Sequence, residues 1–225
     1  MKIAVLGTGM VGQALAARLL ALGHDVVVGT RDPQVSLART EPDGMGNPPF
    51  SAWLEAHPAA ALATFADATA GADLVVNATS GAGAIAALEL AGADNLAGKV
   101  LLDISNPLDF SAGFPPTLFV KDTDSLGEQI QRAFPQTRVV KTLNTLNAHL
   151  MVEPKALGEE SSVFLSGDDE AAKATVTELL ESFGHTDVID LGDITTARGT
   201  EMLLPVWLRL MGALGTPMFN FKVVR

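Results

Sequence analysis

The sequence predicts an α/β fold: a doubly wound parallel sheet followed by a small C-terminal α/β domain. Apolar strand patterns alternate with helical patterns over most of the chain, the order typical of a parallel sheet. The first strand runs directly into a glycine-rich turn and a helix, as in Rossmann folds. Beyond about residue 150 the pattern changes, and two short strands flank one helix. We therefore expect a Rossmann domain at 1–150 and a small domain at 151–225 that completes a cleft.

The turn after the first strand holds the most informative motif of the chain. The apolar strand Lys2–Leu6 leads into a G-x-G-x-x-G run, which consists of Gly7, Thr8, Gly9, Met10, Val11 and Gly12. In such a run the first glycine permits a tight turn, the second lets backbone approach a pyrophosphate, and the third lets helix and strand pack closely. The N–H groups that begin the next helix face the phosphates. The run therefore predicts a dinucleotide-binding site.

The second strand, His24–Val28, indicates which dinucleotide is bound. In an NAD-preferring unit this strand ends in Asp or Glu, about 20 residues past the glycines, to bind the ribose 2′-hydroxyl. Here Gly29, Thr30 and Arg31 follow the strand. A threonine hydroxyl and a guanidinium fork suit a 2′-phosphate, so the sequence favours NADP. Asp32 leaves an alternative open, because an acid at this place serves a ribose instead if the loop turns differently.

The remaining elements follow in regular order. Strands are predicted where apolar runs end in turn residues, and helices where alanine-rich or amphipathic runs lie between them. Residues 40–50 are expected to form a Pro/Gly-rich loop, and residues 105–120 an irregular connection. The predicted strands are Ala61–Thr64, Ala72–Ala78, Lys99–Ile104, Arg138–Leu143, Ser162–Ser166 and Thr186–Asp190. The predicted helices are 51–57, 82–91, 124–133, 169–183 and an apolar helical region from about 195.

Polar side chains gather where these strands end. In open α/β sheets, ligands lie outside the carboxyl ends of the strands. We expect the pyrophosphate and the nicotinamide ribose beside Thr79 and Ser80, and a ring carboxamide or a substrate carbonyl beside Asn144 and Asn147. The expected cofactor contacts beyond the glycine turn are Thr30, Arg31, Asn77, Thr79, Ser80, Asn106, Asn144 and Leu146. For each Asn or Ser, turn or helix-cap chemistry is the competing interpretation.

Few residues at this edge suit acid–base catalysis. Of the four histidines only His149 lies near a strand end predicted to face the site, and a helix-surface position explains it equally well. Lys141 falls within a strand, and a buried hydrogen bond suffices to explain Asp103. The candidates for a catalytic role are therefore His149 and Asn144, and no metal-ligand spacing is evident. The chemistry must come mostly from the cofactor, which favours hydride transfer to an easily reduced acceptor.

Composition limits the partners. The chain has 225 residues, 48% of them hydrophobic, which supports a substantial core. A net charge of −11 without a basic stripe disfavours nucleic acid and anionic membrane surfaces. There is no cysteine, the first strand leaves no room for a signal peptide, and the most apolar stretch, 202–214, is too short to span a bilayer. We expect a cytoplasmic enzyme that acts on a small-molecule redox acceptor.

Several segments resemble the family of NADPH:deazaflavin (coenzyme F420) oxidoreductases. The resemblance spans nearly the whole chain and rests on the glycine turn and on the segments Gly23–Arg31, Val139–Ala148, Ser166–Asp169 and Asp190–Pro205. It implies a Rossmann domain that binds NADP(H), a small C-terminal α/β domain, a homodimer, and coenzyme F420 stacked against nicotinamide in the interdomain cleft. Thr30 and Arg31 match the family's 2′-phosphate contacts. The STEAP reductase domain and the nucleotide domain of pyrroline-5-carboxylate reductase are more distant relatives.

The chain departs from the family pattern at two positions. Family members that act on the deazaflavin tend to carry a histidine where this chain has Asn144 and a proline where it has Asn147. Two alternatives to F420 reduction therefore stay open. One is the reduction of an imine or a carbonyl, with His149 or Asp103 as the proton donor. The other is a non-catalytic NADP-binding redox sensor.

The C-terminal region 199–219 is apolar on nearly every face. A helix of that composition must be buried, either in a plain domain core or at a subunit interface. Pro205 should kink it, because proline lacks the N–H that a helix interior needs. Gly212 and Gly215 would allow close approach of another group to the backbone.

Overall fold

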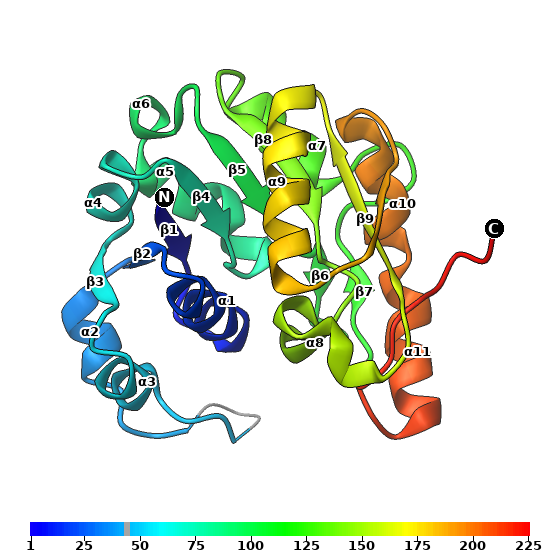
Figure 1. Cartoon of the computed structure of the whole chain (residues 1–225), viewed down its shortest axis with the longest axis horizontal. Helices are drawn as coiled ribbons and strands as arrows, with labels where there is room; N and C mark the ends of the chain where they lie inside the picture. The colour runs from blue at the N-terminus through cyan, green and yellow to red at the C-terminus, as the bar shows by residue number, and fades with distance from the viewer. Residues whose placement is uncertain (43–45) are drawn as a thin grey trace.

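One continuous sheet organises the molecule (Figure 1). The computed structural model describes residues 1–42 and 46–225, and in that part the main sheet has eight strands in the order β10-β9-β8-β5-β4-β1-β2-β3. The strands from β3 through β2, β1, β4 and β5 to β8 run parallel, which confirms the predicted doubly wound arrangement. The strands are β1 (Lys2–Leu6), β2 (Asp25–Thr30), β3 (Ala61–Thr64), β4 (Leu74–Asn77), β5 (Val100–Asp103), β8 (Arg138–Thr142), β9 (Ser162–Gly167) and β10 (Asp187–Asp190).

Helices cover both faces of this sheet. They are α1 (Met10–Ala21), α2 (Pro33–Leu37), α3 (Phe50–Ala56), α4 (Phe65–Ala70), α5 (Ala84–Ala91), α6 (Ala93–Leu96), α7 (Leu126–Ala133), α8 (Ala148–Val152), α9 (Glu170–Phe183), α10 (Ala197–Met202) and α11 (Leu204–Leu214). Within residues 1–42 and 46–225 there are also three short 3₁₀ turns, η1 (Gly81–Gly83), η2 (Pro154–Leu157) and η3 (Ile194–Thr196). The strands and helices that the sequence predicts agree with the structure to within a few residues, and β3 coincides with its prediction. The short helices α2, α4, α6 and α8 were not predicted.

Two apolar cores form because successive residues of a strand point to opposite faces of the sheet. Ile3 and Val5 of β1 enter a core with α1, α8 and α9, whereas Ala4 and Leu6 enter a second core with α4, α5 and α7. Figure 1 shows α1, α8 and α9 along one side of the sheet. The N-terminal end of α1 is thereby fixed against the carboxyl end of β1, where the glycine turn lies.

The C-terminal segment extends the same sheet. Strand β9 pairs with β8 in antiparallel register, with Val140 opposite Gly167, and β10 pairs with β9 in parallel. Helix α9 packs on these strands, as expected for the small α/β unit. The division of the chain near residue 150 into two domains stays a prediction, since the hydrogen bonds of the sheet continue across it.

Two expectations about the chain need correction. The connection 105–120 is not wholly irregular, because β6 (Leu108–Asp109) and β7 (Thr117–Leu118) form a short antiparallel hairpin. The apolar region near the C-terminus is not buried in a plain core either, since Leu204 is the single buried residue of α11. Pro205 acts as predicted, because α10 stops at Met202 and a new helix begins one residue before the proline. Among the described residues no helix combines the length and apolar character that a membrane crossing needs.

Candidate functional site

The glycine turn has the geometry that phosphate binding requires. Gly7 has a φ of +119°, and a Cβ at this position would lie 2.7 Å from the carbonyl oxygen of Ala78. A Cβ on Gly12 would lie 2.1 Å from the carbonyl oxygen of Gly7, so helix and turn touch there. A Cβ on Gly9 would meet nothing within 4 Å, so the space in front of the turn is open. The three glycines therefore divide their roles as the motif predicts.

The N-terminus of α1 faces this open space without a side-chain cap. Gly9 is its N-cap and contributes no side chain, whereas Asp32, Ser125, Asn147 and Asp169 cap α2, α7, α8 and α9 with their side chains. Uncapped N–H groups and the helix dipole attract a phosphate. The residues present thus fit the pyrophosphate of a dinucleotide.

A groove of about 500 Å³ continues from the glycine turn toward the segment after β2. Thr8 and Gly9 line one side of it, and Ser36, Arg39 and Phe50 line the other. The groove has the position expected for the adenosine half of the cofactor, outside the carboxyl ends of β1 and β2. Arg39 was missed by the sequence analysis, because it lies beyond the end of the second strand and belongs to no motif.

The structure gives Asp32, at the end of β2, a role in capping a helix. Asp32 is the N-cap of α2, and its Oδ1 accepts hydrogen bonds from the backbone N–H groups of Gln34 at 2.9 Å and Val35 at 3.1 Å. One oxygen of the carboxylate is therefore occupied by the helix. Arg31 is exposed, and Thr30 is buried with its hydroxyl 2.7 Å from that of Ser36. The strand end thus presents a cation, which suits a 2′-phosphate.

The ends of β4 and β5 are joined by buried hydrogen bonds. Asn77 donates from Nδ2 to Oδ1 of Asp103 at 2.7 Å, and its Oδ1 accepts from the hydroxyl of Thr79 at 2.7 Å. Ser105 donates its hydroxyl to the same Asp103 oxygen at 2.8 Å. Asn77 is fully buried, so in this structure it supports the loop rather than facing solvent. Thr79 is half-buried and Ser80 is exposed, as groups that contact a ligand should be.

At the end of β8, two asparagines hold each other in place. Nδ2 of Asn106 donates to the backbone oxygen of Asn144 at 3.0 Å, and Nδ2 of Asn144 donates to Oδ1 of Asn106 at 3.1 Å. Asn144 also donates to the backbone oxygen of Thr200 in α10 at 3.1 Å. The preceding residue, Leu143, is buried and has a φ of +60°, a strained conformation for leucine. The structure thus brings Asn106 and Asn144 together, with Leu146 buried nearby in the chain.

His149 and Asn147 lie at the start of α8. Asn147 caps this helix, accepting from the N–H groups of His149 and Leu150 at 2.9 and 3.0 Å. The side chain of His149 is exposed and lines a groove between α1 and α8 that Met10 of the glycine turn also lines. The histidine therefore faces the groove along α1, and among the described residues no hydrogen bond joins it to Asn144.

A buried ionic cluster behind this edge was not predicted from the sequence. The ammonium of Lys141 lies 2.8 Å from Oδ2 of Asp103 and 2.9 Å from Oε1 of Glu201, and all three side chains are almost fully buried. Burial disfavours the charged lysine, but the two carboxylates outweigh it, so the pKa of Lys141 lies above its usual value. The periodicity of the sequence does not predict such a cluster, because its three residues belong to separate strands and helices that are far apart in the chain.

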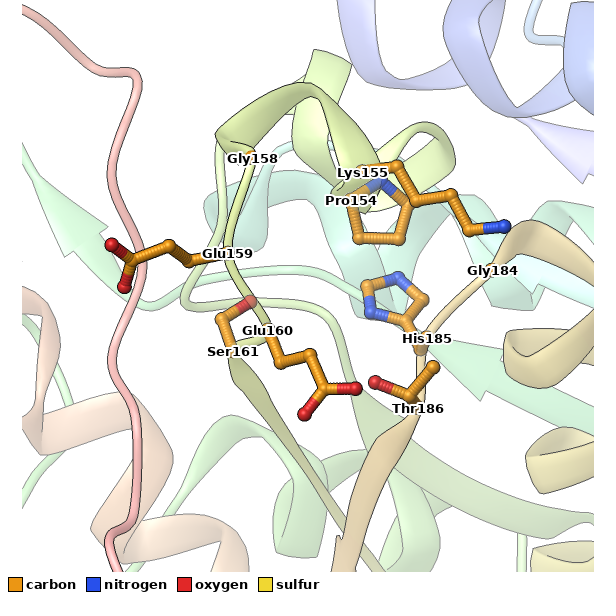
Figure 2. Close-up of a pocket in the computed structure, with 9 residues that line it drawn as sticks. All are labelled: Pro154, Lys155, Gly158, Glu159, Glu160, Ser161, Gly184, His185 and Thr186. Atoms are coloured by element: carbon orange, nitrogen blue, oxygen red, sulfur yellow. The ribbon is translucent and has the colours of Figure 1, made fainter.

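A second cavity, of about 250 Å³, lies apart from the glycine turn (Figure 2). Figure 2 shows that its lining comes from two segments, Pro154–Ser161 and Gly184–Thr186. His185 is buried there and donates from Nε2 to the backbone oxygen of Met151 at 3.0 Å, while its Nδ1 has no partner in the described part of the chain. Desolvation by burial lowers the pKa of His185, so the ring is neutral near pH 7.

The fold and the site together define the class of protein. A parallel sheet with the dinucleotide order, an open glycine turn at an uncapped helix, and a cation at the end of β2 are the features of a dinucleotide-binding Rossmann protein. Residues 2–107 match the family described as NADP oxidoreductase, coenzyme F420-dependent. The chain belongs to this family, as its resemblance to a full-length relative also shows.

That relative is a crystal structure from Arthrobacter sp. FB24 described as a putative F420-dependent NADP-reductase. It shares 66% sequence identity with this chain, covers 100% of both chains and superposes with a TM-score of 0.95. The F420-dependent NADP reductase of Methanothermobacter marburgensis is 27% identical over 93% of this chain and 92% of its own length. Metalloreductase STEAP3 of Rattus norvegicus is 30% identical over 92% of this chain, but the chain spans only 38% of that protein.

Proposed function

We propose that this protein is an NADP-dependent oxidoreductase that transfers a hydride between NADPH and the deazaflavin coenzyme F420. The observation that carries the cofactor assignment is the end of β2, where Arg31 is exposed while the Asp32 carboxylate caps α2. The acceptor assignment is supported by the relatives, since the Methanothermobacter protein is described as F420-dependent and the Arthrobacter protein as a putative F420-dependent reductase.

The residues of the site divide into binding and orienting groups. The glycine turn Gly7–Gly12 and the N-terminus of α1 bind the pyrophosphate, Thr30 and Arg31 recognise the 2′-phosphate, and Thr79 and Ser80 lie beside the nicotinamide ribose. When bound, NADPH supplies the hydride, so the protein must orient two flat rings and exclude water. Asn144, fixed by Asn106 and Thr200, is rigid enough to orient a ring amide.

Two residues remain candidates for contact with the acceptor. Asn144 stands where deazaflavin-dependent members tend to have a histidine, and its amide cannot act as an acid or base at neutral pH. His149 faces the groove shared with Met10, which makes it the nearer candidate for a proton donor. We therefore assign orientation to Asn144 and proton donation, where an acceptor requires it, to His149.

The experiment is an assay of NADPH oxidation with purified F420, with flavins, ferric chelates and a cyclic imine as parallel acceptors. Saturable reduction of F420, much faster than that of the other acceptors, supports the proposal. Turnover with a flavin or a ferric chelate instead would align the protein with the STEAP reductase. Turnover with the imine alone would make it an imine reductase. Tight binding of NADPH without turnover of any acceptor would support the alternative that the protein is a non-catalytic redox sensor.

We further propose that the protein is a cytoplasmic homodimer that acts on a small molecule and binds neither nucleic acid nor membrane. The net charge of −11 supports the last point. The apolar residues of α11 support the dimer, since Val206 is 50% and Leu214 is 56% exposed in the single chain. Sedimentation velocity should show a dimer for the wild type and a monomer for V206D. The control V35D, on the exposed helix α2, should leave the dimer intact, and a monomeric wild type would contradict the proposal.

A further inference from the structure

The buried ionic cluster of Lys141, Asp103 and Glu201 satisfies every charged group that it contains. The ammonium of Lys141 has three donors, and it contacts Asp103, Glu201 and the backbone oxygen of Ser105. Glu201 also accepts from the backbone N–H of Leu126 at 2.8 Å and of Gly127 at 3.0 Å, so it lies at the N-terminus of α7. The side chains come from β5, β8 and α10, and the cluster therefore connects the sheet with the C-terminal segment.

Hydrogen bonds lead from the Lys141 cluster to the candidate site in two directions. On one side Asp103 holds Asn77, whose side chain holds Thr79, and Asp103 also holds the hydroxyl of Ser105. On the other side Glu201 follows directly after Thr200, whose backbone oxygen accepts from Asn144. The loops that follow β4, β5 and β8 are thus tied to one ammonium group.

Stability alone is a poor reason for such an arrangement. Two carboxylates and one ammonium carry a net negative charge into the core, which is offset by the N–H groups at the start of α7 and by the hydrogen bonds that Asn77 and Ser105 donate to Asp103. Buried ion pairs of this kind are often no more stabilising than apolar residues of similar volume. Their directional bonds do fix geometry, because each partner loses its hydrogen bonds if it moves.

We propose that Lys141 is a positioning residue for the hydride-transfer reaction. It acts through Asp103 and Glu201, and it keeps Thr79 and Asn144 at the spacing that the nicotinamide and the acceptor need. This inference rests on the proposed oxidoreductase function. It concerns the nicotinamide end of the cofactor, since the adenosine end lies at the groove beside Arg39 and depends on other residues.

The K141M variant removes the cation and leaves the Asp103 and Glu201 carboxylates without it. Without the ammonium, nothing joins these carboxylates to each other, and the loops after β4, β5 and β8 lose their common partner. We expect kcat to fall by about 10- to 100-fold, because small misplacements of reacting groups lower the rate by factors of this size.

The double variant K141M/E201Q keeps the proposal testable if K141M does not fold. It replaces one ion pair by neutral groups of similar volume, a change that buried pairs often tolerate. It should show the same loss of kcat, since β8 is no longer joined to β5 and α10 through Lys141. The dissociation constant of NADP⁺, measured by calorimetry, should change less than about threefold in both variants, because the phosphate contacts are separate.

The K173M variant is the matched control. Lys173 is also a buried lysine with two carboxylate partners, Glu170 and Asp190, each at 2.8 Å, but it lies on α9 away from the glycine turn. K173M should lower the melting temperature and leave kcat unchanged. If K141M/E201Q folds and keeps the wild-type kcat, Lys141 has only a structural role and the inference is overturned. A wild type without turnover of any acceptor would overturn the proposed function instead, and NADP⁺ binding would still be measurable.

Discussion

Replacing Arg31 by alanine tests the assignment of cofactor preference to the end of β2. In the cofactor complex the exposed guanidinium of Arg31 is expected to donate to a 2′-phosphate that NADH lacks. A hydrogen bond to a charged group is worth about 1.5–3 kcal/mol. Because solvent screens an exposed ion pair, the lower part of that range, about 1.5–2 kcal/mol, applies here. This free energy corresponds to about a 10- to 30-fold change in kcat/KM.

The expected result is therefore a selective loss. R31A should lower kcat/KM for NADPH by about 10- to 30-fold, mostly through KM, and change kcat/KM for NADH by less than about twofold. The side chain is exposed, so the melting temperature should stay the same. Steady-state rates with both cofactors and one fixed acceptor measure the ratio, and thermal unfolding verifies the fold.

Asp32 supplies the matched controls for this experiment. D32A removes the cap that Gln34 and Val35 use, so it should lower the free energy of unfolding by about 0.5–2 kcal/mol without changing the ratio of NADPH to NADH turnover. D32N keeps a capping oxygen and should behave like the wild type. An equal loss with both cofactors in R31A, or a selective loss of NADH turnover in D32A, would refute the assignment.

Two further predictions follow from the glycine turn and from the second cavity. G9A should fold normally and raise the KM for NADPH, because its Cβ enters only the open space before the turn. G12A should lose more than about 2 kcal/mol of unfolding free energy, because its Cβ would lie 2.1 Å from the carbonyl oxygen of Gly7; equal stabilities of the two variants in urea denaturation would contradict this. Burial lowers the pKa of His185 in the folded protein, so the unfolded state binds a proton on this ring more readily than the folded state does. The contribution of the neutral His185 ring to the free energy of unfolding is therefore present above pH 6.5, and it is lost as the pH falls through the lower pKa of the folded state. H185Q should therefore flatten the decrease of unfolding free energy between pH 6.5 and acid, and an unchanged slope would count against a neutral, buried His185.

The sequence predicted the fold well because its signals are local. Alternating apolar and turn residues indicated the strands, and the G-x-G-x-x-G run indicated the first turn, since Gly7 has a positive φ and a Cβ on Gly12 would collide with Gly7. The apolar character of α11 was recognised as well. The exposure of α11 was not recognised, because an apolar pattern indicates that a helix face needs a partner but does not indicate whether that partner lies in the same chain.

The candidate site was predicted only in part, for a physical reason. Strand ends bring polar residues to one edge, which identified Thr79, Ser80, Asn106 and Asn144. Which side chains bond one another depends on rotamers and on distant segments, so the burial of Asn77 and the committed carboxylate of Asp32 could not be derived from spacing. Asn147 illustrates the competing interpretation, since its side chain caps α8.

The end of β8 shows how the C-terminal segment contributes to a site whose motifs all lie earlier in the chain. Leu143 has a φ of +60°, and such strain costs on the order of 1–3 kcal/mol, so the surrounding contacts must hold it. Its backbone oxygen accepts from the N–H of Leu146 at 3.2 Å, and the next residue, Asn144, is held by Thr200 of α10. Glu201 in the same helix holds Lys141 within β8. Helix α10 therefore fixes the strand from both sides of the strained residue, and this makes the orientation of the Asn144 amide a property of the whole chain rather than of its dinucleotide motif.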